Sequence, residues 1–246
     1  MRAAGRVDGV LFDIDDTLVD TRGAFAVALA AVAGHYLPDV ASDRHPEVLA
    51  TWRADTGGHY AAYTRGEVSY VAQRMARANE LHARFGGPVL DEDGFRRWDV
   101  LFEERFAGAW AAHDDAAAVV DRLVSAGVVV GALTNAAVAY QTSKLTRVGL
   151  VDRVPVLVGV DTLGVGKPDP RVFTEACRLL GTDPARTAYV GDELEVDAAA
   201  ARTAGLLGVW LDRPGPRRLP VTAEQVAAAG VPVIGSLSEL PDLLGL

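Results

Sequence analysis

Cysteine is almost absent from the sequence, since Cys177 is the only one in 246 residues. An intrachain disulfide is therefore excluded, which fits a reducing cytoplasm. Long apolar runs are also lacking, because none approaches the roughly 18 residues needed to span a bilayer. The opening stretch, MRAAGRVDGV, has no apolar segment followed by a cleavage site, so no secretory signal is expected. We expect a cytoplasmic protein with no membrane partner, and we place Cys177 in the core on an amphipathic helix.

Lysine is the second scarce residue: only Lys144 and Lys167 occur, and arginine supplies the other basic side chains. The net charge is −9 and the pI is about 5.0. This acidity argues against nucleic acid or an anionic membrane as a partner. With 50% hydrophobic and 23% charged residues, the composition is that of a globular protein. The length is sufficient for a core domain and a smaller second domain.

Two kinds of apolar spacing divide the chain. Residues 7–15 are predicted to form a first strand, apolar on both faces and therefore central in a parallel sheet. From about residue 22 to residue 112 the spacing is helical, and no strand is predicted. Beyond this segment, short β-branched runs alternate with predicted helices, one of which is EVDAAAARTAG, residues 195–205. This alternation indicates a doubly wound parallel sheet. We predict an α/β core domain of residues 1–20 and 113–246, with a smaller all-helical domain of residues 21–112 between its two parts.

Polar residues follow the predicted strands of the core at the points where the strands end. These strand-to-loop junctions contribute, in chain order, Asp13 and Asp15, Thr134 and Asn135, Lys167, and Asp192 and Asp197. In an open parallel sheet, ligands bind at the carboxyl ends of the strands, near the point where strand order reverses. The sequence therefore predicts that the functional site is built from these residues.

The stretch VLFDIDDTLVD, residues 10–20, places Asp13, Asp15 and Asp16 directly after a buried strand. Like charges this close raise each other's pKa, so the arrangement is unfavourable unless a cation offsets it. Mg²⁺ is suited to this role because it is bound by one or two carboxylates, and Lys167 would add a fixed positive charge. Asp16 is assigned to the turn or to a helix cap.

The stretches FDIDDTL, ALTN, GKPDP and GDELEVD resemble, in order and separation, the motifs of the haloacid dehalogenase superfamily, whose members are mostly phosphohydrolases. The resemblance covers the core domain from end to end. Residues 22–112 fall where one large branch of the superfamily carries its cap, between the first and second motifs. The resemblance implies a Rossmann-like core with a helical cap, and a Mg²⁺-dependent phosphatase that acts on a small-molecule phosphate ester.

The chemistry of phosphate esters gives the carboxylates distinct expected roles. Asp13 is the expected nucleophile, which attacks phosphorus to form an aspartyl phosphate. Mg²⁺ is expected to bind the side chains of Asp13 and Asp192 and the backbone carbonyl of Asp15. Asp15 is expected to act as a general acid toward the leaving oxygen and then as a general base toward water.

The remaining predicted site residues support the phosphate and the metal. Lys167 is expected beside the nucleophile and the phosphate. Thr134 and the backbone amide of Asn135 are expected to hold non-bridging phosphate oxygens, with an ordinary turn residue as the alternative for Asn135. Asp197 is expected to support the metal shell or to orient Lys167, rather than to bind the metal directly.

Several alternatives stay open. Superfamily members that displace halide from carbon lack the second aspartate and need no Mg²⁺, so Asp15 favours phosphoryl chemistry over dehalogenation. A phosphomutase would have nearly the same catalytic residues, and a non-catalytic binding domain could retain the site. Neither the substrate nor the oligomeric state, monomer or homodimer, is fixed by these patterns. In the helical domain, Arg74 and Arg77 are expected on a solvated helix face, with a substrate contact as the alternative.

Overall fold

The apolar run Gly9–Phe12 forms β1, which is fully buried and lies at the centre of a parallel sheet. In the residues that the computed structural model describes, 7–215, 217 and 220–246, this sheet has six strands in the order β3-β2-β1-β4-β5-β6. The other strands are β2 (Val129–Leu133), β3 (Val156–Val158), β4 (Thr187–Gly191), β5 (Leu207–Leu211) and β6 (Val233–Ile234). Every neighbouring pair runs parallel. Strand order reverses between β1 and β4, so a ligand site is expected at their carboxyl ends.

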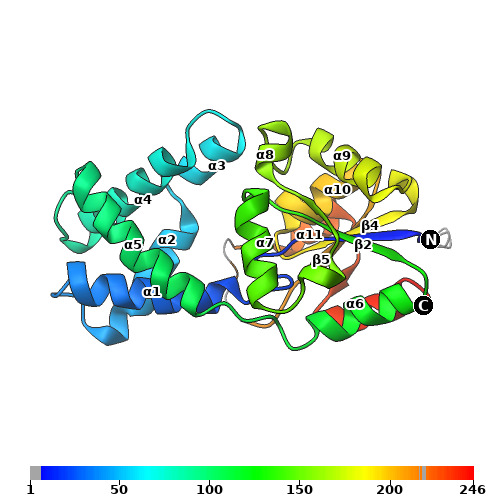
Figure 1. Ribbon diagram of the computed structural model, residues 1–246, viewed down its shortest axis with the longest axis horizontal. Helices are drawn as coiled ribbons and strands as arrows, with labels where there is room; N and C mark the ends of the chain where they lie inside the picture. Colours follow the sequence, from blue (N-terminus) through cyan, green and yellow to red (C-terminus); the bar gives the residue numbers. More distant parts are fainter. Residues whose placement is uncertain (1–6, 216, 218–219) are drawn as a thin grey trace. The chain divides into compact units, whose positions relative to one another are not determined.

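Helices cover both faces of this sheet (Figure 1). Because successive side chains of a strand point to opposite faces, β1 contributes to two hydrophobic clusters. Phe12 packs in the cluster that includes α6 (Ala116–Ser125), whereas Leu11 packs in the cluster that includes α9 (Pro170–Leu180). The other α-helices of this unit are α7 (Val138–Arg147), α8 (Val160–Leu163), α10 (Ala200–Thr203), α11 (Ala223–Ala229) and α12 (Leu240–Leu243). Cys177 lies in the buried face of α9, as predicted.

The predicted fold class, an α/β doubly wound parallel sheet with a smaller all-helical part, is confirmed. Two local predictions were wrong. The first strand was expected to reach residue 15 but ends at Phe12, because the chain then turns through Asp16, which has a left-handed φ of 61°. The segment EVDAAAARTAG was expected to form one helix, but Leu194–Ala199 is a π-helical segment that precedes α10. Such segments are rare and occur frequently at functional sites.

Residues Thr21–Ala111 form a second unit that is separate from the unit made of Met1–Asp20 and Ala112–Leu246. Its helices are α1 (Thr21–Tyr36), α2 (His45–Ala54), α3 (His59–Thr64), α4 (Tyr70–Phe85) and α5 (Glu92–Gly108). Ser69 caps α4 by accepting a hydrogen bond from the amide of Ala72, which satisfies one of the unpaired N–H groups of the first turn. Aromatic rings fill the interior, where Trp98 and Phe102 stack with centroids 5.2 Å apart.

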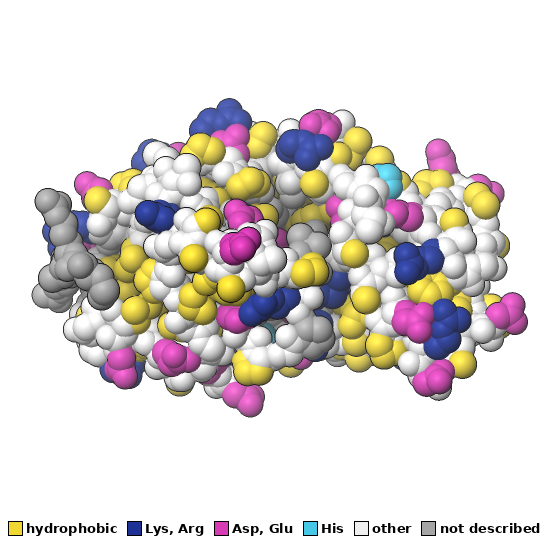
Figure 2. Space-filling model, turned by 180° about the vertical axis from the view of Figure 1, so that it is seen from behind, with side chains coloured by type: hydrophobic (Ala, Val, Ile, Leu, Met, Phe, Trp, Pro, Cys, Tyr) yellow, Lys and Arg dark blue, Asp and Glu magenta, His cyan; other side chains and the backbone are white. Residues whose placement is uncertain are grey.

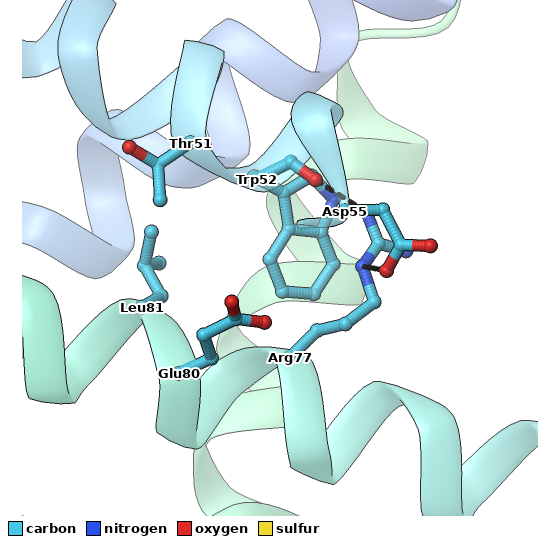
Figure 3. Close-up of a pocket in the computed structure, with 6 residues that line it drawn as sticks. All are labelled: Thr51, Trp52, Asp55, Arg77, Glu80 and Leu81. Carbon is cyan, nitrogen blue, oxygen red and sulfur yellow. Dashed lines mark hydrogen bonds and ion pairs between the residues drawn. The ribbon is translucent and has the colours of Figure 1, made fainter. Parts of the chain in front are cut away.

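Arg74 and Arg77 were expected on a solvated helix face, and this prediction was wrong. Arg74 is 5% exposed, pairs with Glu103 at 2.6 Å, and lies 4.3 Å from the centroid of Phe102. Arg77 lies 4.1 Å over the Trp52 ring and donates to the Trp52 carbonyl at 2.6 Å (Figure 3). Apolar arginine stems and cation–π contacts place guanidinium groups in an aromatic interior, which a polar sequence pattern does not reveal.

The surface mixes charges of both signs. On the face drawn in Figure 2, Lys and Arg side chains are scattered among Asp and Glu side chains over the described residues. No helix in the described part of the chain combines the length and the apolar character that crossing a membrane requires.

Candidate active site

The carboxyl ends of β1 and β4 bring Asp13 and Asp192 together. Phe12 pairs in register with Val190, and the Asp13 amide donates to the Val190 carbonyl at 2.8 Å. On the other side of β1, Phe12 pairs with Ala132 of β2, whose strand leads into Thr134. The sheet register therefore sets the positions of these residues, although they lie far apart along the chain.

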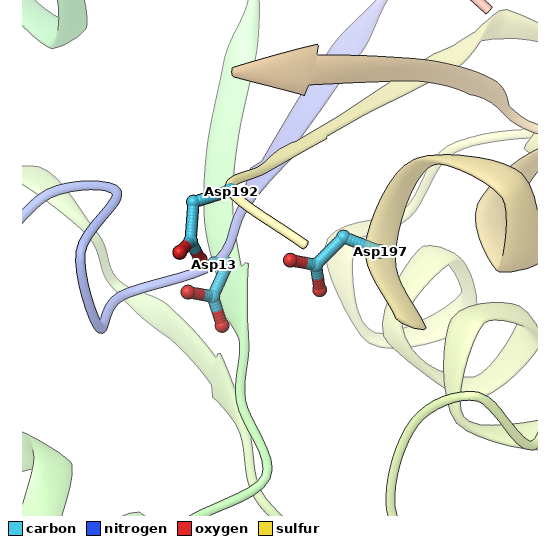
Figure 4. Close-up of side chains that lie close together, drawn as sticks. All are labelled: Asp13, Asp192 and Asp197. Atoms are coloured by element: carbon cyan, nitrogen blue, oxygen red, sulfur yellow. The ribbon is translucent and has the colours of Figure 1, made fainter. Parts of the chain in front are cut away.

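Asp13, Asp192 and Asp197 converge on one point (Figure 4). One carboxylate oxygen from each lies within 4.8 Å of the others. Burial raises the pKa of Asp13 from 3.8 to about 8, helped by the negative charges of Asp197 and Asp15 and opposed by Lys167. Burial also raises the pKa of Asp192 well above its ordinary value, with Asp16 and Asp13 contributing. The cluster is thus short of positive charge.

Lys167 is the buried cation of this cluster. Its ammonium donates to Asp13 Oδ1 at 2.7 Å, to Asp197 Oδ1 at 2.6 Å and to the Tyr189 hydroxyl at 2.7 Å. An ammonium has three N–H groups, so these bonds use all of them. Although burial works against the charged form, Asp13 and Asp197 raise the pKa of Lys167 well above its ordinary value. Lys167 is therefore held in a fixed position and stays protonated.

The Asn135 side chain fixes the loop that carries Lys167. Its Nδ2 donates to the Lys167 carbonyl at 2.9 Å, and its Oδ1 accepts from the Lys167 amide at 2.6 Å. The neighbouring Thr134 is buried, and its hydroxyl accepts from the Ala136 amide at 3.2 Å and from Gln141 Nε2 at 3.1 Å. The Asn135 contacts join the loop after β2 to the loop between α8 and α9 that carries Lys167.

The π-helical segment turns Asp197 toward Lys167. Asp197 Oδ2 accepts a hydrogen bond from the Glu193 amide at 2.9 Å, while Oδ1 faces the lysine. Gly191 allows this close approach, because a Cβ atom on it would lie 2.4 Å from the carboxyl carbon of Asp197. The glycine of the GDELEVD stretch is therefore required by space rather than by backbone conformation.

Asp15 lies apart from this triad of carboxylates, and two side chains from α7 bind it. Lys144 Nζ donates to Asp15 Oδ1, and Gln141 Nε2 donates to Asp15 Oδ2 at 2.6 Å. Sequence reasoning missed both α7 residues, as it missed Tyr189. The scarcity of lysine was the only signal that could have drawn attention to Lys144.

The oxygen donors fit a magnesium ion. Asp13 and Asp192 could hold Mg²⁺ through their carboxylates, because this hard cation is bound by one or two carboxylates and keeps several waters. Burial and mutual repulsion raise the pKa of both groups, and bound Mg²⁺ would favour their ionised forms. A cation at this position would thus relieve the charge imbalance of the cluster.

This imbalance predicts a pH-dependent stability difference between the wild type and Asp13→Asn. The pKa of Asp13 in the folded protein, about 8, exceeds its ordinary 3.8, so the folded state holds an extra proton between these values. The contribution of Asp13 to the free energy of unfolding is therefore lost as pH rises from about 4 to about 8. We expect metal-free wild type to lose stability relative to the variant over this window, as measured by urea unfolding in EDTA.

Comparison with the variant is needed because two histidines act in the opposite direction. Burial lowers the pKa of His82 and His113, so their contribution to stability grows as pH rises. Saturating Mg²⁺ is expected to remove the relative loss in the wild type. A difference between the two proteins that stays constant with pH in EDTA would contradict the account.

A protein-family model described as haloacid dehalogenase-like hydrolase matches residues 7–205. The chain is 31% identical over 201 residues to the N-acetylmuramic acid 6-phosphate phosphatase of Pseudomonas aeruginosa, with 81% of this chain and 79% of the relative covered. It is 29% identical over 248 residues to the ribulose-1,5-bisphosphate 5-phosphatase of Halopiger xanaduensis, with 96% and 98% covered. Both relatives are named for the removal of phosphate from a small molecule.

Solved structures share the fold. A HAD family hydrolase from Deinococcus radiodurans, solved with bound phosphate and sodium, superposes with a TM-score of 0.74 at 24% identity. The alignment covers 99% of this chain and 96% of that one. At this level of identity the match establishes the fold.

Proposed function

Since the chain belongs to the haloacid dehalogenase-like hydrolase family, we propose that it is a Mg²⁺-dependent phosphohydrolase that acts on a small phosphorylated metabolite. The observation that carries this proposal is the buried Asp13 carboxylate, which is held by Lys167 and lies beside Asp192 and Asp197. Uncatalysed phosphate-monoester hydrolysis is among the slowest reactions known, so the catalyst must divide and lower a very large barrier. A carboxylate nucleophile flanked by fixed positive charge does both.

The first step transfers the phosphoryl group to Asp13. A carboxylate oxygen of Asp13 attacks phosphorus, the bond to the ester oxygen breaks, and that oxygen takes a proton from Asp15. Lys167 reduces the repulsion between the incoming phosphate and the nucleophile, and it does so from a position that three hydrogen bonds fix in advance. When bound, Mg²⁺ would supply the additional positive charge that two anions need in order to approach.

The second step returns the enzyme to its starting state. Asp15, now ionised, accepts a proton from a water molecule as that water attacks phosphorus. The bond between phosphorus and the Asp13 oxygen breaks, and inorganic phosphate is released. In this step Thr134 and the backbone amide of Asn135 would hold the non-bridging phosphate oxygens, at the point where the Asn135 side chain fixes the loop of Lys167. We assign the choice of leaving group to the helical residues 21–112, where the family resemblance places a cap.

The proposal is tested by phosphate release from p-nitrophenyl phosphate and a panel of sugar, glycolate and nucleotide monophosphates, with Mg²⁺ or with EDTA. We expect release that requires the metal, and the panel would rank the metabolites. Isomerised sugar phosphate without free phosphate would indicate a mutase instead. Mg²⁺ binding with no turnover of any ester would indicate a binding domain.

Asp15→Asn is expected to lower kcat by about 10²–10⁴-fold, because the amide can neither donate the proton to the leaving oxygen nor accept one from water. Mg²⁺ binding, measured by calorimetry, is expected to survive, since the backbone carbonyl of residue 15 is unchanged. Asp16→Asn is the matched control, because asparagine tolerates the left-handed φ of 61° at this position. The control is expected to keep kcat within the same order of magnitude. Full activity of Asp15→Asn would remove Asp15 from the mechanism.

A further inference from the structure

Two side chains from one face of α7 hold the Asp15 carboxylate. Lys144 Nζ binds Oδ1, and Gln141 Nε2 binds Oδ2 at 2.6 Å. Gln141 and Lys144 are three positions apart, so they lie on the same side of the helix and reach the two oxygens together. The second N–H of the Gln141 amide donates to the Thr134 hydroxyl at 3.1 Å. Both oxygens of Asp15 are thus fixed from a single rigid element.

Neither Lys144 nor Gln141 is the residue type that would make the folded protein most stable at its position. Lys144 is 1% exposed, although the Asp15 side chain it binds is 37% exposed and within reach of water. Burying an ammonium carries a desolvation penalty that a partly exposed ion pair repays poorly. Gln141 is fully buried, and its Oε1 accepts no hydrogen bond within the described chain. An apolar side chain would avoid that unpaired acceptor, which is unfavourable in a buried position.

We propose that Lys144 and Gln141 are positioning residues, which fix the rotamer of Asp15 so that its carboxyl can deliver a proton to the leaving oxygen. The inference rests on the proposed function, because it assigns these residues to the proton-transfer part of the same reaction. General acid catalysis requires the acid within hydrogen-bond reach of the atom that it protonates. A displacement of 1 Å in such a group can reduce the rate 10²-fold.

Comparing two leaving groups distinguishes a positioning role from a purely structural one. A purely structural defect would lower the rates with both substrates equally. Phenolate is a poor leaving group and depends on protonation, whereas 2,4-dinitrophenolate departs without it. A misplaced Asp15 therefore slows the first step with phenyl phosphate far more than with 2,4-dinitrophenyl phosphate. The value of kcat/KM depends on the steps up to and including this first step. The kcat/KM for phenyl phosphate divided by that for 2,4-dinitrophenyl phosphate therefore measures how well Asp15 is placed.

The experiment compares the wild type with Lys144→Met, Gln141→Met and the reference variant Asp15→Asn, all with saturating Mg²⁺. We expect the kcat/KM ratio of phenyl phosphate to 2,4-dinitrophenyl phosphate to fall about 10²-fold or more in Asp15→Asn, and in the same direction by about tenfold or more in both α7 variants. Arg147→Met, which removes an exposed cation in the last turn of α7, is the control and should leave the ratio unchanged. Gln141→Met keeps the buried lysine and removes an unpaired acceptor, so it provides a folded test even if Lys144→Met unfolds.

The outcomes separate this inference from the proposed function. Equal losses with both substrates in the α7 variants would overturn the positioning role, because loss of charge or of packing alone lowers both rates together. An unchanged ratio in Gln141→Met would overturn it as well. A wild type that hydrolyses neither ester, or an Asp13→Asn variant as active as the wild type, would overturn the proposed function and with it this inference.

Discussion

Replacing Asp13 by asparagine is expected to lower Mg²⁺-dependent phosphate release by roughly 10⁴–10⁶-fold, as removal of a covalent nucleophile does in other enzymes. The amide has nearly the shape of the carboxyl group but is a poor nucleophile. Lys167 keeps its contacts to Asp197 and Tyr189 in this variant, so the rest of the site is expected to stay in place. The measurement is single-substrate kinetics on the best ester of the panel.

The same variant is expected to fold at least as well as the wild type when metal is absent. Burial raises the pKa of Asp13 to about 8, so at neutral pH the asparagine removes a carboxyl group that is unfavourable to ionise. Asp152→Asn, which changes an exposed carboxyl group away from the site, is the control and should retain activity. If Asp13→Asn folds normally and keeps an appreciable share of wild-type activity, Asp13 is not the nucleophile.

Lys167→Met is expected to abolish activity and also to destabilise the protein strongly. The substitution leaves Asp13 and Asp197 buried without the cation that both contact. Removing one partner of a buried ion pair costs about 3–5 kcal/mol, because the remaining charge is uncompensated. The free energy of unfolding, obtained from urea curves at neutral pH in EDTA, should fall by about that amount.

Arg171→Met is the matched control for Lys167→Met. Arg171 also pairs with an aspartate, at 2.6 Å from Asp169, but its side chain is 68% exposed. Exposed pairs contribute about 0–1 kcal/mol, so this variant should be nearly as stable as the wild type. Equal destabilisation by the two substitutions would show that the buried lysine is not the electrostatic centre of the site.

The sequence predicted the candidate site residues that directly follow strands of the parallel sheet. The apolar run before Asp13, together with the strands before Thr134 and Asp192, indicated which residues a parallel sheet would place at one edge. This prediction needed no side-chain geometry, because parallel strands share the edge at which they end. The sheet order is consistent with it, since β1 lies between β2 and β4.

Residues whose role depends on side-chain packing could not be predicted in this way. Lys144 and Gln141 meet Asp15 only because α7 presents one face to the turn after β1, and nothing in the local sequence fixes that rotation. Tyr189 reads as a core residue of β4, and its hydroxyl becomes important only because Lys167 lies 2.7 Å away. Arg74 was predicted on the surface because its side chain is charged, but the residue is buried in the structure. The apolar carbons of an arginine side chain allow such burial.

The central claim is that the phosphoryl group passes through Asp13, and the most direct test is to locate it during turnover. Asp15→Asn, supplied with 2,4-dinitrophenyl phosphate and Mg²⁺, should complete the first step, which then needs no acid, and stall at the second, which needs a base. Acid quenching, proteolysis and mass spectrometry should find a phosphoryl group on the peptide that contains Asp13. A burst of dinitrophenolate with the phosphoryl group on another residue, or with no protein-bound phosphoryl group, would contradict the account.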